Sequence, residues 1–131
     1  MAGAGVAGDR LAFDDDIWTE EVDRFDAGSR AHTAATVARR QMDRSGARVV
    51  VRACDTEGSD GTRLSGCAKV YVPLDVEPSD APFGFVLALR ADADRTVRLR
   101  LLAFGERHPA PGTRSVYERA HKRLHGRYPD E

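Results

Sequence analysis

Apolar residues recur at helical spacing in the first third of the chain. Ile17, Trp18, Val22 and Phe25 predict an amphipathic helix over residues 15–26. Three aspartates stand at its expected start, where carboxylates accept hydrogen bonds from the first N–H groups and complement the helix dipole. A Gly-Ser pair then breaks the pattern, which indicates the end of this helix.

A second helix is expected over residues 30–44. Ser29 can cap its start, and Ser45-Gly46 closes it. The two segments together predict a helical hairpin with a short turn. The second helix has a face of small apolar side chains, namely Ala31, Ala34, Ala35, Val37, Ala38 and Met42.

From residue 48 the pattern changes to the two-residue period of strands. β-Branched and aromatic residues, bounded by loops rich in Asp, Gly and Pro, predict strands over 48–53, 67–74, 83–91 and 96–104. A very short edge strand is expected at Leu11–Phe13, and Asp92–Arg95 is expected to form a tight hairpin. On the last strand Val97, Leu99, Leu101 and Ala103 should share one face, and Arg98, Arg100, Leu102 and Phe104 the other.

The chain is expected to finish with a helix over about 115–126. Ser115 and Glu118 have the spacing of a capping box, and Gly126 can end the helix. Its buried stripe is expected to hold Val116, Tyr117, Ala120 and Leu124.

This order predicts an α+β fold. Two N-terminal helices and one C-terminal helix should pack on a small, mostly antiparallel sheet of four to five strands, with the helices on one face. Residues 1–10 are rich in Gly and Ala and are expected to be a disordered leader. Residues 11–128 are then one domain, which suits the total length of 131 residues.

Charge is distributed unevenly, although the net charge is only -1. Residues 1–29 hold eight acids and two arginines, whereas residues 95–128 hold nine Lys/Arg and two acids. One interpretation is an anionic partner for the C-terminal half, most commonly nucleic acid. The other is an internal pairing of the acidic start with the basic end.

The chain has two cysteines, no secretory signal and no apolar run long enough to span a membrane. We therefore expect a reducing compartment, the cytoplasm, and no membrane partner. Cys54 and Cys67 are too far apart for a CxxC site and are expected in the core.

Candidate chemistry gathers in Val97–Leu124, where a strand leads through a Gly-Glu-Arg-His turn into the basic helix. Arg107 can stabilise a phosphate, and His108 or Tyr117 can move a proton. The alternatives are a solvated turn for Arg107 and His108 and a core position for Tyr117. Lys69 and Tyr71 share one strand face and either line a groove or face solvent.

Two histidines, His121 and His125, lie four residues apart on the last helix, a spacing that can hold zinc. No Glu stands between them as in H-E-x-x-H, and no third ligand is evident. We therefore expect surface histidines, no metal and no cofactor.

Three stretches resemble the RelE/ParE superfamily of bacterial toxins, a fold of two helices on a small sheet plus a C-terminal helix. LAFDDDIW (11–18) resembles the segment in which the family's first strand runs into its first helix. TRLSGCAKVYV (62–72) resembles the entry to the family's second strand. LLAFGERH and SVYERAHKRL (101–108 and 115–124) resemble the closing strand, arginine, tyrosine and helix of the family.

The RelE branch of the family implies a metal-independent, ribosome-dependent mRNA endonuclease in which the 2′-hydroxyl attacks the adjacent phosphate. By position in the family pattern, Lys69 matches a lysine of the sheet. Arg107 matches an arginine that stabilises negative charge on phosphorus, and Tyr117 matches a tyrosine that stacks on a base or transfers a proton. His108 is an additional candidate base. The resemblance also implies an acidic antitoxin as partner. The residues expected to contact RNA phosphates are Arg98, Arg100, Arg119, Lys122, Arg123 and Arg127.

The chain departs from the family pattern at two positions. Tyr71 stands where a second sheet lysine is expected, and Val86 where an arginine is expected. Three hypotheses therefore follow. The first is a RelE-like endoribonuclease, and the second is a non-catalytic protein of the same fold that binds nucleic acid or an acidic protein. The third is an unrelated α+β domain whose basic helix pairs with its own acidic N-terminus.

Overall fold

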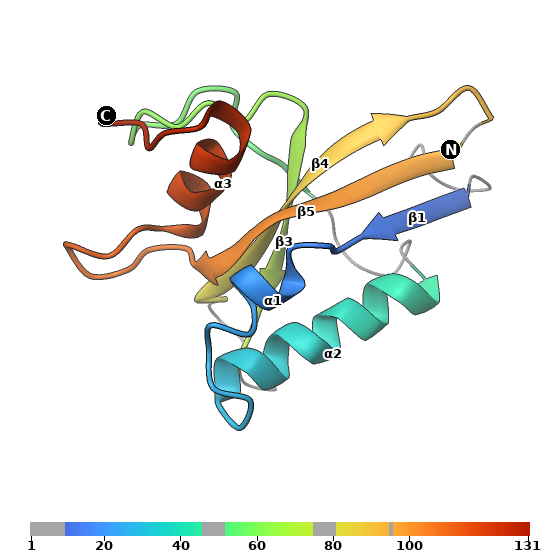
Figure 1. Ribbon diagram of the computed structural model, residues 1–131, viewed down its shortest axis with the longest axis horizontal. Helices are drawn as coiled ribbons and strands as arrows, with labels where there is room; N and C mark the ends of the chain where they lie inside the picture. Colours follow the sequence, from blue (N-terminus) through green and yellow to red (C-terminus); the bar gives the residue numbers. More distant parts are fainter. Residues whose placement is uncertain (1–9, 46–51, 75–80, 95) are drawn as a thin grey trace.

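Five strands form one mixed sheet in the order β1-β5-β4-β3-β2 in a computed structural model, which describes residues 10–45, 52–74, 81–94 and 96–131. β1 pairs with β5 in parallel, and the other neighbours pair antiparallel. With three helices in the described residues, the architecture is α+β (Figure 1). The strands are β1 Arg10–Asp14, β2 Arg52–Ala53, β3 Cys67–Val72, β4 Phe83–Ala91 and β5 Thr96–Glu106.

The strand expectations agree closely with these bounds where local pattern is strong. β4 has the expected bounds, and β5 continues two residues beyond the expected 104. β1 begins at Arg10, a residue that was expected in the leader, and residues 1–9 lie outside the described residues. Of the expected strand 48–53, only β2 is described, because residues 46–51 lie outside the described part of the chain.

The helices are α1 Trp18–Glu21, α2 Arg30–Ser45 and α3 Val116–His125. α3 has the expected capping box between Ser115 and Glu118, and Gly126 ends it in the left-handed conformation with φ 84°. These two signals are local, because each depends on residues that are neighbours in the sequence.

α1 is much shorter than the helix expected over residues 15–26. The chain leaves the helix at Val22, and Phe25 packs edge-on against Phe83 and Phe104, at ring-centroid distances of 5.7 and 5.5 Å. Contacts with the sheet therefore override the local helical periodicity.

The sheet is covered on both faces, which corrects the expectation that all helices lie on one face. α1 and α2 lie on one side of the strands and α3 on the other (Figure 1). Val22 and the small residues of α2 pack against Val70, Phe85 and Leu101. Val116 and Ala120 of α3 pack against the opposite face. The sequence of β4 already indicated that both faces of the sheet are covered. It is an almost continuous apolar run, which is typical of a strand buried on both faces.

A β-bulge interrupts the alternation expected for β5. Val86 pairs with Ala103 while Leu87 pairs with Leu101, so Leu102 is an extra residue. Leu102 and Ala103 therefore both face α3, and Phe104 joins Leu101 on the opposite face. The expected face assignment is wrong beyond the bulge, because one added residue reverses every later side chain.

β1 pairs with β5 only along residues 96–100. Beyond that point, side chains bond the main chain of β5 along the edge that β1 leaves open. Glu21 accepts a hydrogen bond from the Phe104 N–H at 3.2 Å, and Arg24 donates to the Phe104 carbonyl at 2.8 Å. Arg123 of α3 donates to the Leu102 carbonyl at 3.0 Å. These bonds satisfy main-chain groups that an open edge would leave free to pair with another chain.

Glu21 is 1% exposed and joins α1 to α3. Both Arg119 and Arg123 donate hydrogen bonds to its carboxylate. The acidic start and the basic end of the chain are therefore paired with each other at this point, as the second interpretation of the charge asymmetry expected.

Candidate functional site

A cavity of about 520 Å³ opens on the α3 face of the sheet. Its walls come from the loop that joins β2 to β3, from β3 itself, from the loop after β5 and from the first turn of α3. All four candidate catalytic residues line it, namely Lys69, Arg107, His108 and Tyr117.

Arg107 and Tyr117 are in direct contact in this cavity. The Nε–H of Arg107 donates to the Tyr117 hydroxyl oxygen at 3.0 Å, and Nη1 donates to the Ala81 carbonyl at 3.0 Å. The Arg107 stem lies over Gly84, where an added Cβ would be 3.4 Å from Cγ of Arg107. The guanidinium is thus fixed by two hydrogen bonds, and its Nη2 group has no hydrogen-bond partner among the described residues.

Tyr71 lies against the same guanidinium. The Arg107 Cζ atom is 3.8 Å from the centre of the Tyr71 ring, a cation–π contact. The Lys69 ammonium is 5.8 Å from the Tyr71 ring centre and 5.5 Å from that of Tyr117. Lys69 therefore lines the cavity, whereas Tyr71 is not among the residues that line it but contacts Lys69 and Arg107, which do.

Tyr117 is half-buried, with its ring against the α3-side core and its hydroxyl on Arg107. The ring of Tyr117 therefore packs in the core, as one interpretation expected, and its hydroxyl faces the cavity, as the other expected. His108 is exposed at the cavity mouth. The cavity wall also has three carboxylates, from Asp55, Asp60 and Glu118, so its charge is mixed.

Two of these carboxylates already have protein partners. Asp60 accepts hydrogen bonds from the Thr62 N–H and hydroxyl, and Glu118 belongs to the capping box and pairs with Arg114. These two acids hold their own loops. Among the residues that line the cavity, the two Lys and Arg side chains are Lys69 and Arg107, and each has unused hydrogen-bond donors.

His121 is buried, at 2% exposed, which corrects the expectation of a surface histidine. Its Nδ1 accepts the Arg63 N–H at 3.0 Å, and His125 Nε2 lies 3.0 Å from the Arg63 carbonyl oxygen. Burial, together with the neighbouring His125 and Arg63, lowers the pKa of His121. The two histidines thus bind the main chain of the loop that forms one wall of the cavity.

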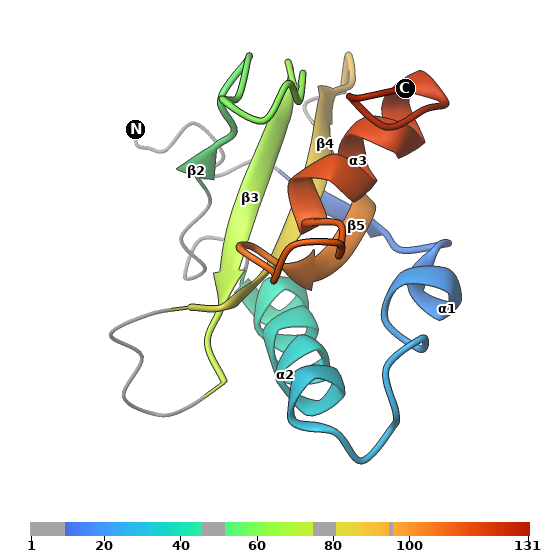
Figure 2. The same ribbon diagram turned by 90° about the vertical axis from the view of Figure 1, so that its left-hand side faces the viewer.

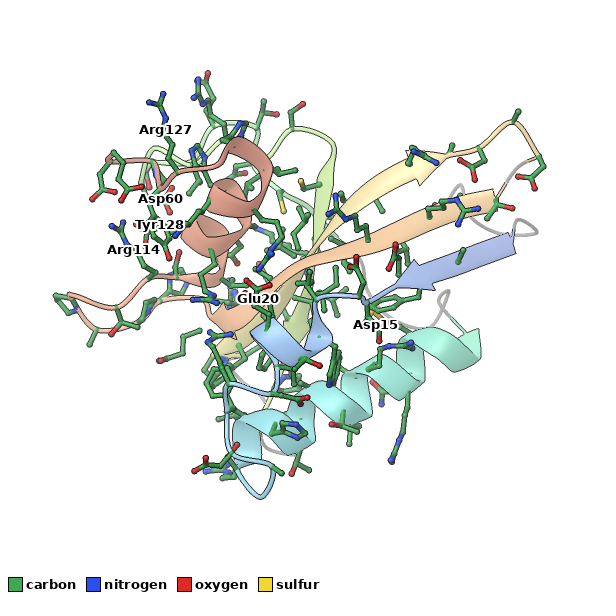
Figure 3. The ribbon with its side chains drawn as sticks, in the orientation of Figure 1. Asp15, Glu20, Asp60, Arg114, Arg127 and Tyr128 are labelled. Carbon is green, nitrogen blue, oxygen red and sulfur yellow. The ribbon has the colours of Figure 1, made fainter. Side chains whose placement is uncertain are left out.

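The residues expected to contact RNA phosphates do not form one surface. Arg98 and Arg100 lie in the half of β5 away from the cavity, and Arg98 pairs with Asp92 at 2.6 Å. Arg119 and Arg123 are held by Glu21. Lys122 lies over the Tyr128 ring, and Arg127 points outward beyond the end of α3 (Figure 3).

Neither cysteine supplies a nucleophile. Burial, followed by the neighbouring Cys67, raises the pKa of Cys54 to about 11. Burial also raises the pKa of Cys67. Both are therefore thiols at neutral pH, and the thiolate is the reactive form.

Sequence reasoning missed two features of the site. Arg52 of β2, which Figure 2 shows at one edge of the sheet beside β3, lies 5.1 Å from the Tyr71 ring centre. The Ala81 carbonyl that holds Arg107 belongs to the segment leading into β4. The only local signal for Arg52 was its place in the RVVVRA run, which has no functional pattern of its own.

Within the described residues there is no group of three or more His, Cys, Asp and Glu side chains placed to hold a metal ion. In the same part of the chain, no helix is both long and apolar enough to cross a bilayer. Comparisons with protein-family models, with curated proteins and with solved structures find no match.

Proposed function

We propose that this chain is a RelE-like endoribonuclease that cleaves mRNA on the ribosome by 2′-hydroxyl attack. The observation that carries the proposal is the hydrogen bond of 3.0 Å between Arg107 and Tyr117, beside Lys69, in an open cavity. A fixed guanidinium, an ammonium and a phenol within one cavity are the groups that metal-independent phosphodiester cleavage needs.

In the proposed reaction the 2′-oxygen forms a bond to the adjacent phosphorus, and the bond from phosphorus to the 5′-oxygen breaks. The products are a 2′,3′-cyclic phosphate and a free 5′-hydroxyl. Extra negative charge develops on the phosphoryl oxygens during the reaction, and the free donors of Arg107 together with Lys69 stabilise it.

Two proton transfers accompany this step. We assign the acceptance of the 2′-hydroxyl proton to His108, because it lines the cavity and is exposed. Tyr117 accepts a hydrogen bond from Arg107, which leaves its own O–H free to donate a proton to the departing 5′-oxygen.

The test uses purified ribosomes programmed with mRNA, and growth after induction in bacteria. The native chain should cut the message and arrest growth, and Arg107→Ala should abolish both. Arg40→Ala is the matched control, because Arg40 is an exposed arginine of α2 on the opposite face of the sheet. Uncut RNA under all conditions, with purified protein that is folded, rejects the proposal.

The second candidate is a non-catalytic protein that binds nucleic acid or an acidic partner. The observation that favours it is the position of Arg127, exposed beyond α3 and without an ion pair among the described residues. Retention of the partner without RNA cleavage, weakened by Arg127→Ala but not by Arg107→Ala, would support this candidate.

If the chain is a toxin, an acidic antitoxin is the expected partner. A small reading frame next to this gene that encodes an acidic, helix-rich protein would support the first candidate. Co-expression of that protein should restore growth.

A further inference from the structure

Three cations surround the ring of Tyr71. The charged groups of Arg107, Arg52 and Lys69 lie 3.8, 5.1 and 5.8 Å from its centre. The sheet register explains this arrangement. Arg52 and Lys69 are directly paired across β2 and β3, so they share a face, and Tyr71 is two residues further along the same face.

These three cations differ from several other arginines of the molecule. Arg39, Arg98, Arg114, Arg119 and Arg123 each have a carboxylate within ion-pair distance. Among the described residues, none of Arg52, Lys69 and Arg107 has such a partner. Like charges held around one ring repel each other, and a bound anion would relieve that repulsion.

The cations also have hydrogen-bond donors to offer. Arg107 has used Nε and Nη1, which leaves Nη2. Arg52 is exposed, and neither Arg52 nor Lys69 makes a side-chain hydrogen bond within the described residues. Lys69 lies between the rings of Tyr71 and Tyr117, so it connects the Arg107–Tyr117 pair to Arg52.

We propose that Arg52, held with Lys69 at the Tyr71 ring, binds a second phosphate of single-stranded RNA, next to the phosphate bound by Arg107. The inference rests on the proposed function, because it identifies a second binding point on the same substrate. Basic side chains interleaved with aromatic rings are the usual means by which proteins bind single strands. In this arrangement Arg52 binds substrate, and Tyr71 positions the cations.

The experiment uses a non-cleavable 2′-O-methyl RNA of about six nucleotides, a length within the usual range of single-strand sites. A neutral methylphosphonate replaces each phosphate in turn, and affinity is measured by fluorescence anisotropy. For the native chain, two adjacent replacements should weaken binding more than the others. In Arg52→Ala one of these two positions should become insensitive, because its protein partner is gone.

The variants separate this effect from a structural one. Arg52→Ala should weaken binding of the unmodified RNA about tenfold. It should also make the slope of log affinity against log salt shallower by about 0.7. Tyr71→Leu should weaken binding similarly, Tyr71→Phe should not, and Arg40→Ala serves as the matched arginine control. Because the Arg52 side chain is exposed, the thermal unfolding midpoint of the Arg52→Ala variant should match that of the Arg40→Ala variant.

The outcomes distinguish this inference from the proposed function. If Arg52→Ala behaves like Arg40→Ala while RNA is still cleaved, the second phosphate site is overturned and the nuclease stands. If the methylphosphonate pattern appears but no RNA is cut, the phosphate site is supported and the nuclease is rejected. If the native chain does not bind the oligonucleotide, the second phosphate site is overturned, and the cleavage assay with ribosomes decides the nuclease separately.

Discussion

Arg119 of α3 forms a two-point hydrogen bond with the buried Glu21 of α1, with Nε 3.0 Å from Oε1 and Nη2 2.7 Å from Oε2. Arg123 also contacts this carboxylate, at 3.0 Å. Arginines that looked available for a ligand in the sequence are therefore occupied in holding the two ends of the chain together. Among the candidate residues that the structure describes, Lys69 and Arg107 in the cavity remain available to a ligand, as does Arg127 beyond α3.

Removal of the Glu21 carboxylate should strongly destabilise the fold. Glu21→Ala removes the buried carboxylate that holds the half-buried Arg119 and Arg123, and we expect a loss of about 3–5 kcal/mol in the free energy of unfolding, measured with urea. Glu20→Ala is the matched control, because Glu20 also pairs with Arg123 but is exposed, so its loss should stay below about 1 kcal/mol. Equal losses would contradict the role given to Glu21.

The lowered pKa of Glu21 predicts how the free energy of unfolding changes at low pH. Burial would raise the pKa of Glu21, but the hydrogen bonds and charge of Arg119 outweigh it and lower the pKa below its ordinary value of 4.5. A carboxyl whose pKa is lower in the folded state stabilises the fold fully above its unfolded pKa. That contribution is lost as the pH falls below 4.5 and through the folded pKa. Urea unfolding of Glu21→Gln should show a shallower acid loss than the native chain.

His121 predicts a second pH effect in a higher range. Its folded pKa is lowered, mainly by burial, so the unfolded state takes up a proton first. The contribution of His121 to stability is complete above its ordinary pKa of 6.5 and falls as the pH drops below that value. His121→Asn should therefore lose less stability than the native chain between about pH 7.5 and about pH 5.5. An unchanged pH dependence would show that His121 is not bound as described.

The Tyr117 hydroxyl should matter more for cleavage than for binding. Tyr117→Phe removes the acceptor of the Arg107 Nε–H, and we expect cleavage to fall by about 10²–10³-fold. Affinity for a non-cleavable RNA should fall far less, because Arg107 keeps its bond to Ala81 and its contact with Tyr71. Tyr128→Phe is the matched tyrosine control, since its ring lies against Arg114 and Lys122, outside the cavity. Parallel losses of cleavage and affinity would argue against a role in proton transfer.

Cys54 should be slow to react, although it lines the cavity. With its pKa raised to about 11, the thiolate fraction at neutral pH is small. In a Cys67→Ala background, alkylation by iodoacetamide, followed by mass spectrometry, should accelerate about tenfold per pH unit below that pKa. Rapid labelling at neutral pH would show that the loop exposes the thiol.

Elements with local signals were predictable from the sequence. The capping box at Ser115 and Glu118, the stop at Gly126 and the bounds of β4 depend on residues that are neighbours in the chain. The proximity of Arg107 and Tyr117 could also be predicted, because a short loop separates the end of β5 from the start of α3.

Features that depend on distant contacts were not predictable. The helix expected at 15–26 is cut short because Phe25 packs against two strands that come much later in the chain. The bulge at Leu102 depends on the partner strand, and the burial of His121 depends on the Arg63 main chain. Arg52 reaches the Tyr71 ring only because β2 pairs with β3.

The parallel pairing of β1 with β5 joins the first strand of the chain to the last one. During synthesis β1 has no strand to pair with until residues 96–100 have emerged, so the sheet is completed late. Arg107 and Tyr117 are made later still. A nascent chain therefore has neither a finished sheet nor its cavity until the residues of β5 and α3 have left the ribosome, so the proposed activity depends on segments that are made well after β1.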